Sequence, residues 1–241
     1  MRNDIRMQSE PKVFIDVIGS LFFPLILTVA LLGVAGMGGC ASKTPWEDPG
    51  LSYGAEEFSS VLRKRVPNLS TDLHRAPFEI SKQTSQLASK KLADAPLGSN
   101  PVWELISLLS EPEPEGLGLE YDWSVSANAK QTLELGRGDC VALATVLVGL
   151  GRSLGWPIYF AEARTENPIA HEFEELTVLS GHMVVIVLSQ EGRLVIDFLG
   201  LVDDDAYDIR PIDDLTAYAH LINNVAGHKV INRDSKGSLE G

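Results

Sequence analysis

The sequence is poor in cysteine and in basic residues, and each shortage excludes a class of protein. Only 2 cysteines occur among 241 residues, which excludes the disulfide framework of small secreted domains. Lysine and arginine number 20 against 33 acidic residues, giving a formal net charge of -13. Nucleic-acid binding needs clustered basic side chains, and none are clustered here. Because an anionic lipid surface would also repel this charge, membrane attachment would need a dedicated segment or a lipid.

A segment of that kind is present near the N-terminus. No charged residue lies between Val17 and Ser42, and the twelve residues at the start of the chain contain three basic ones, as in the n-region of a signal peptide. Small residues and Met37 precede Cys40, an arrangement that resembles the lipobox of bacterial lipoproteins. We therefore expect cleavage before Cys40, lipid attachment to Cys40, and a location in the bacterial cell envelope, on the periplasmic face. The alternative is an uncleaved transmembrane helix, which also places the rest of the chain outside the cytoplasm.

The remainder is long enough for one domain with a sizeable core. We expect a lipidated tether over residues 40–52, a helical or irregular support region over 53–120, the main domain over 121–232 and a flexible tail over 233–241. Within the support region, Asn100 followed by Pro101 predicts a helix over Pro101–Ser110. The acidic, proline-rich stretch 111–116 is typical of a solvated connector.

The patterns after Asp122 predict an α+β fold. Leucines spaced along one helical face predict a helix over Cys140–Leu154, and a shorter helix is expected over Asn128–Glu134. Strands are predicted over Ile158–Ala163, Met183–Leu188 and Leu194–Leu199, and a terminal helix over Asp213–Ile231. The polar stretch Thr165–Ser180 is expected to be irregular. The prediction is an antiparallel sheet packed on the cysteine-bearing helix.

Cys140 is the one thiol left if Cys40 carries lipid. A single cysteine is more often a small buried hydrophobic residue than a nucleophile. Here, however, Gly138 permits a sharp turn, Asp139 can cap the helix, and the sulfur occupies the first helical position, where the helix dipole favours the thiolate. The free N–H groups at that position could also stabilise an oxyanion.

A thiolate needs a proton partner, and sequence context favours His182 among the five histidines. It directly precedes the hydrophobic run 183–187, so it lies at the start of a core strand, where a side chain can face a cleft. His171 is the one rival, since His74 lies in a weakly patterned region and the other two, His220 and His228, lie on the terminal helix.

Asp197 is the candidate that orients the imidazole of His182. If Leu188 lies opposite Arg193 in a hairpin, His182 lies opposite Leu199. Asp197 then shares a face with His182 as a diagonal neighbour. A slip of one residue would put the two side chains on opposite faces.

These motifs resemble the transglutaminase-like superfamily, whose fold is papain-like. The resemblance rests on residues 136–140 opening a helix, on His182 leading a strand and on the run 195–198. It extends to 121–124 and 222–224, and thus covers about half of the chain. It implies that Cys140 is the nucleophile, His182 the general base and then acid, and Asp197 the orienting group of a thiol enzyme that transfers acyl groups from peptide or side-chain amides. Water as acceptor would make it a peptidase or amidase, and a lysine amine would make it a transglutaminase.

Several alternatives stay open. The domain could be a catalytically inactive binding or scaffold lipoprotein, because a fold can be reused without its chemistry. The family uses a further donor to the oxyanion, for which Trp123 is a candidate, although packing of Trp123 in the core is the stronger expectation. A metal site formed by His171, His182 and the acidic triplet 203–205 lacks ligand spacing and is disfavoured. We expect no cofactor, no metal and no nucleic acid, and a protein or peptide substrate.

Overall fold

The computed structural model describes residues 12–16, 50–164, 169–173, 176–180, 182–189, 192–200 and 207–237. The helices are α1 (Ala55–Arg65), the 3-10 helix η1 (Thr71–His74), α2 (Lys82–Ala93), α3 (Pro101–Ser110), α4 (Ala129–Leu135), α5 (Cys140–Ser153) and α6 (Asp214–Gly237). The strands are β1 (Lys12–Asp16), β2 (Glu120–Tyr121), β3 (Arg137–Gly138), β4 (Ile158–Arg164), β5 (Ile169–Phe173), β6 (Leu176–Ser180), β7 (His182–Ser189), β8 (Gly192–Asp197) and β9 (Asp208–Pro211).

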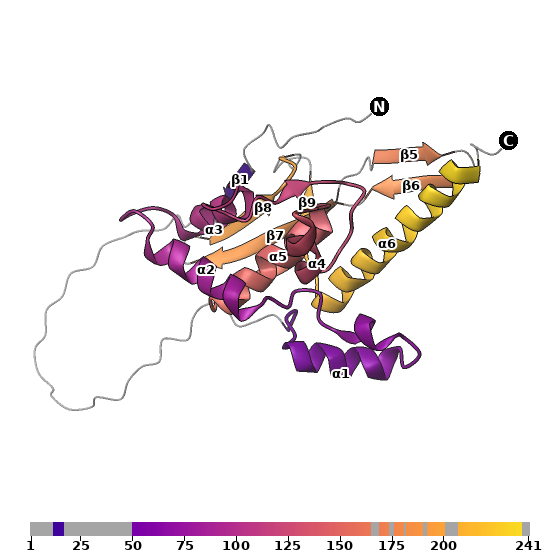
Figure 1. Cartoon of the computed structure of the whole chain (residues 1–241), viewed down its shortest axis with the longest axis horizontal. Helices are drawn as coiled ribbons and strands as arrows, with labels where there is room; N and C mark the ends of the chain where they lie inside the picture. Colours follow the sequence, from indigo (N-terminus) through magenta and orange to yellow (C-terminus); the bar gives the residue numbers. More distant parts are fainter. Residues whose placement is uncertain are drawn as a thin grey trace, which may run out of the picture.

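The centre of the fold is an antiparallel sheet in the order β1-β8-β7-β4-β9. Helix α5 packs on β7 and β4 and is drawn in front of the sheet in Figure 1. Short β2 and β3 form a parallel pair, and β5 and β6 form a separate antiparallel pair. The α+β class is therefore confirmed.

The cysteine-bearing helix forms because its sequence is apolar and well capped. Twelve of its residues are buried, and the Asp139 side chain accepts the N–H of Ala142 at its start. Gly149 lies so close to the N-terminal part of the chain that an added Cβ would overlap the carbonyl oxygen of Phe78. The helix ends before Gly155, whose φ of 78° is easily reached only by glycine.

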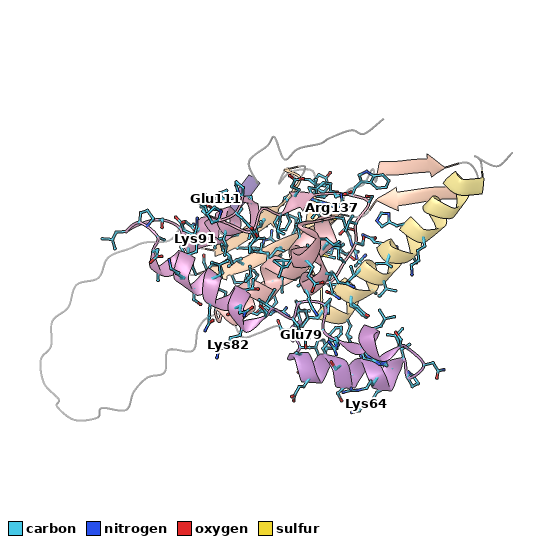
Figure 2. All side chains as sticks on the ribbon, in the orientation of Figure 1. Lys64, Glu79, Lys82, Lys91, Glu111 and Arg137 are labelled. Atoms are coloured by element: carbon cyan, nitrogen blue, oxygen red, sulfur yellow. The ribbon has the colours of Figure 1, made fainter. Side chains whose placement is uncertain are left out.

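The region before Tyr121 shares one hydrophobic core with the region after it. Phe58 packs edge to face on Phe78 and on Tyr218, with ring centroids 5.9 and 5.5 Å apart. Leu105 and Leu147, both 0% exposed, belong to the same core. The ion pair between Lys91 and Glu111, 2.7 Å long, joins α2 to the residue after α3, and Figure 2 shows both side chains on that side of the molecule. Residues 53–120 are therefore an integral part of the core around α5.

The predicted elements are largely confirmed, with differences where patterns are short or mixed. Helix α3 has the predicted bounds, and α6 extends six residues beyond the predicted end. The stretch predicted as irregular contains strands β5 and β6, whose polar residues obscured the alternation in the sequence. Strand β9 was not predicted, because four residues give too short a pattern.

Strand β1 lies inside the predicted signal peptide. It pairs antiparallel with β8, with Phe14 opposite Val195. Removal of residues 1–39 would therefore leave β8 at the edge of the sheet. The cleavage itself stays a prediction, because Cys40 lies outside the described residues.

Candidate functional site: a cysteine, a histidine and an aspartate

The thiol of Cys140 lies at the first position of α5. Two glycines shortly before it make this geometry possible: Gly136 ends α4 with a φ of 66°, and a Cβ on Gly138 would come within 2.5 Å of Ala142 Cβ. Cys140 is 8% exposed. In any α-helix the first N–H groups lack partners within the helix. Here Asp139 accepts that of Ala142 at 2.8 Å, which leaves the N–H groups of Cys140 and Val141 at the helix end beside the sulfur.

His182 and Asp197 meet across the β7–β8 hairpin. The observed register, with Leu188 opposite Arg193, is the predicted one. His182 Nε2 lies 2.6 Å from Asp197 Oδ1. The same Oδ1 accepts the backbone N–H of Leu199 at 2.9 Å, and Asp197 is fully buried. The prediction that the two side chains share a face is confirmed.

His182 also interacts electrostatically with Cys140. Because an ionised carboxylate only accepts hydrogen bonds, Nε2 carries the proton shared with Asp197. The other nitrogen, Nδ1, is then the one available to the thiol. Burial lowers the pKa of His182, but hydrogen bonds to Asp197 and to Cys140, and the charges of both, outweigh it and raise the pKa to about 9. The imidazole can therefore hold a proton at neutral pH.

Tyr121 is a neighbour of this group that the sequence analysis did not single out. Strand β2 places it opposite Gly138, two residues before Cys140. Burial raises the pKa of its hydroxyl, and the charges of Cys140, Asp139, Asp197 and Asp122 raise it further. The hydroxyl is therefore a permanent hydrogen-bond donor at neutral pH. The resemblance includes residues 121–124 but gives Tyr121 no role, and a two-residue strand leaves no pattern that would place its hydroxyl beside Cys140.

Trp123 does not pack in the core, and that expectation was wrong. It is 55% exposed, and its ring lies 5.8 Å from the ring of His228 on α6. Its neighbour Asp122 accepts the hydroxyl of Ser124 at 2.6 Å and pairs with Arg137 at 3.4 Å. Figure 2 labels Arg137 on β3, so this exposed group adjoins the β2–β3 pair. Asp122 Oδ1 also accepts the backbone N–H of Ser124 at 2.9 Å in the turn that carries the exposed indole.

The other sequence candidates lie elsewhere. His74 is buried and its Nε2 lies 3.2 Å from the carbonyl oxygen of Val66. His220 Nε2 lies 2.6 Å from Glu162 Oε1. The side chain of His171, the acidic triplet 203–205 and Cys40 lie outside the described part of the chain.

The described residues contain neither a cluster of metal-ligating side chains nor a membrane-spanning helix. Among these residues, no three histidine, cysteine, aspartate or glutamate side chains are grouped as metal ligands. Within the same ranges, every helix is too short or too polar to span a bilayer.

Comparison with known proteins gives one distant likeness. No family model matches the sequence, and no curated protein matches it either. Among solved structures, a candidate cysteine protease from Cytophaga hutchinsonii is similar with a TM-score of 0.39 and 15% sequence identity, over 61% of this chain. The match spans about half of that protein, 48% of its length.

Proposed function

We propose that the protein is an envelope-anchored, transglutaminase-like thiol enzyme that transfers acyl groups from peptide or side-chain amides. One observation carries the proposal: His182 Nε2 lies 2.6 Å from the buried carboxylate of Asp197, and interaction with Cys140 also raises the pKa of His182. A buried imidazole held between a carboxylate and a thiol is the arrangement that activates a sulfur nucleophile.

In the first half of the reaction the Cys140 thiolate attacks the carbonyl carbon of an amide. The carbon–sulfur bond forms as the carbonyl π electrons move to oxygen. His182, protonated at Nδ1, gives its proton to the amide nitrogen. The carbon–nitrogen bond then breaks, the amine leaves, and a thioester remains on Cys140.

In the second half an acceptor attacks the thioester, and the acceptor decides the product. His182 Nδ1 takes a proton from water or from a primary amine as the new bond forms, and the thiolate leaves. Water gives a carboxylic acid, whereas a lysine amine gives a new amide cross-link.

Stabilisation of the negative oxygen in both halves is assigned to neutral donors beside the sulfur. The candidates are the N–H groups of Cys140 and Val141 and the hydroxyl of Tyr121, whose pKa is raised by burial and by neighbouring negative charge. Tyr121 replaces Trp123 as the side-chain donor in this proposal, because it lies closer to the charges of the site. A Tyr121→Phe variant should lose about a hundredfold to a thousandfold in kcat, as other enzymes do on loss of one such donor.

The activity is tested with Cys40→Ser protein, so that Cys140 is the one thiol. Peptide and glutamine-containing substrates are incubated with and without a primary amine, and products are read by mass spectrometry. Hydrolysis or amine incorporation that is absent in Cys140→Ala supports the proposal. If neither product forms with any amide while the protein is folded, enzymatic acyl transfer is rejected.

The envelope location is proposed from the lipobox-like segment alone. Cells expressing the full chain are fed labelled fatty acid, and the protein is captured. Incorporation should occur in the wild type and be absent in Cys40→Ser. Equal labelling or normal processing of the variant would reject Cys40 as the lipidated residue, and a wild type that is neither labelled nor cleaved would favour the uncleaved helix.

A second candidate, an inactive domain used for binding, is favoured by the low exposure of the thiol. Cys140 is 8% exposed, so little of this residue is open to a substrate. A thiol that alkylates slowly at every pH would support this candidate.

A further inference from the structure

Asp139, the residue before the thiol, is held at both of its carboxylate oxygens. Oδ1 accepts the N–H of Ala142 at 2.8 Å, which caps α5. Oδ2 accepts the hydroxyl of Ser126 and the side-chain amide of Asn224, the latter at 3.0 Å. Asp139 is 4% exposed. A buried carboxylate therefore stays in place through three neutral donors, and it directly precedes Cys140.

The side-chain amide of Asn224 that donates to Asp139 belongs to α6, which packs along α5. Near its own start, α6 is tied to the end of α5 by Asp214 and Arg152. Ten residues later, a distance of about 15 Å along a helix, Asn224 reaches the start of α5. The two helices therefore run antiparallel, and one helix touches both ends of the other.

We infer that Asn224 is a positioning residue that fixes Cys140 through Asp139. Its amide restrains the carboxylate so that Oδ1 stays on the Ala142 N–H, which keeps the first turn of α5 closed and the sulfur facing His182. The consequence for reactivity rests on the proposed function. The consequence for the first turn of α5 does not.

The neighbouring residue supplies a matched control. Asn223 is exposed, whereas Asn224 is half-buried. Replacing either by aspartate adds the same charge to the same helix, but only at 224 does it face Asp139. Two carboxylates at hydrogen-bond distance cannot both be ionised without a large penalty, so Asn224→Asp repels Asp139 at pH 8. When the pair takes up one proton at acidic pH, an O–H donor is restored.

Other titratable groups surround this pair and must be accounted for. They are Tyr121 on β2, Asp122 in the following turn, Cys140, His182 and Asp197 across the site, and His228 one turn further along α6. All are present in both aspartate variants. The ratio of the labelling rates of the two variants at each pH therefore removes the contribution of these surrounding groups.

The experiment measures iodoacetamide labelling of Cys140 from pH 5 to pH 8 in the full-length Cys40→Ser background. Fold is checked by circular dichroism at each pH. Asn224→Leu is expected to label about tenfold more slowly than wild type at pH 6, since it leaves a charged group short of one donor. The labelling rate of Asn224→Asp divided by that of Asn223→Asp should be low at pH 8 and should approach one at pH 5. A residue that only stabilises the fold would change the melting temperature but not this ratio in folded protein.

Hydrogen exchange of the Ala142 amide separates failure of this inference from failure of the proposed function. The Ala142 amide should exchange faster in Asn224→Leu than in Asn223→Leu, whether or not Cys140 is an activated thiol. If the wild-type thiol titrates as a free thiol does but this exchange difference is observed, the proposed function fails and the inference about Asn224 is supported. If Asn224→Leu does not fold, the pH ratio of the aspartate variants decides. A flat ratio, or an Asn224→Leu variant with wild-type labelling and exchange, would overturn the inference.

Discussion

The two ends of α5 are held by different kinds of contact. At its C-terminal end, Arg152 makes two hydrogen bonds of 2.8 Å to Asp214, which is fully buried. The guanidinium also lies 4.7 Å from the ring centroid of Phe78. Asp214 accepts the backbone N–H of Tyr53 at 2.8 Å as well. At the N-terminal end, neutral donors hold Asp139, and Cys140 interacts electrostatically with His182.

The C-terminal end of α5 therefore contributes to stability, and the N-terminal end carries the groups of the proposed reaction. A buried ion pair whose atoms are all bonded is costly to break, and it does not change during a reaction. At the other end the groups that can change their charge are Cys140 and His182, the two that the proposed reaction uses. Fixing one end rigidly allows the other to carry reactive groups on a helix that does not shift.

The largest expected effect follows from removing the sulfur. Cys140→Ala should abolish labelling of the Cys40→Ser protein and any turnover. The loss in stability should be only about 1 kcal/mol or less, since one small buried atom is removed. Labelling by mass spectrometry and urea unfolding measure the two effects. A fully labelled Cys140→Ala protein would mean that another residue is the reactive one.

A substitution at the C-terminal end of α5 should lower the free energy of unfolding and leave the reactivity of Cys140 unchanged. Arg152→Met leaves Asp214 buried without its charged partner, which should cost about 3–5 kcal/mol of unfolding free energy. The matched control is Lys90→Met, because Lys90 pairs with Asp94 at the surface, where such pairs contribute less than about 1 kcal/mol. Urea unfolding gives both values. Equal losses in the two variants would show that the Arg152 pair does not anchor the helix.

The pH dependence of stability should report His182. Its pKa is raised to about 9 from the ordinary 6.5, so the protonated form stabilises the fold fully below pH 6.5. This contribution, at most roughly 3 kcal/mol, is lost as the pH rises through about 9. The stability gap between wild type and His182→Ala should therefore be larger at pH 6 than at pH 9.5. A gap that widens toward pH 9.5 would reverse the assigned sign.

A smaller effect is expected midway along the helix. Gly149→Ala would push a methyl group into the backbone of Phe78 and should cost about 1–3 kcal/mol by overpacking. Gly227→Ala on α6 has no atom within 4 Å of its new methyl group and should gain about 0.5–1 kcal/mol from helix propensity. Thermal unfolding of the two variants should move in opposite directions.

Local patterns in the sequence predicted the reactive end of α5 well. The leucine spacing defined the helix, and the β7–β8 register follows from hydrophobic alternation, so the pairing of His182 with Asp197 could be deduced. These features depend on residues close in sequence or joined by one short turn.

Contacts between distant segments could not be predicted from the sequence. The bond from Asn224 to Asp139 joins residues 85 positions apart, and Tyr121 reaches the site through a strand of two residues. The Arg152–Asp214 pair depends on where α6 lies against α5. None of these leaves a periodic signal, because each depends on packing of the whole chain.

The most direct test of the central claim is the labelling rate of Cys140 against pH in wild type and His182→Ala, both in the Cys40→Ser background. If His182 and Cys140 form an ion pair, wild type should label readily at pH 6, and Asp197→Ala should label more slowly because its imidazole is no longer oriented. His182→Ala should label only as the pH approaches the range of a free thiol, about 8.5. A wild-type profile that rises only in that range, and that His182→Ala reproduces, would contradict the account.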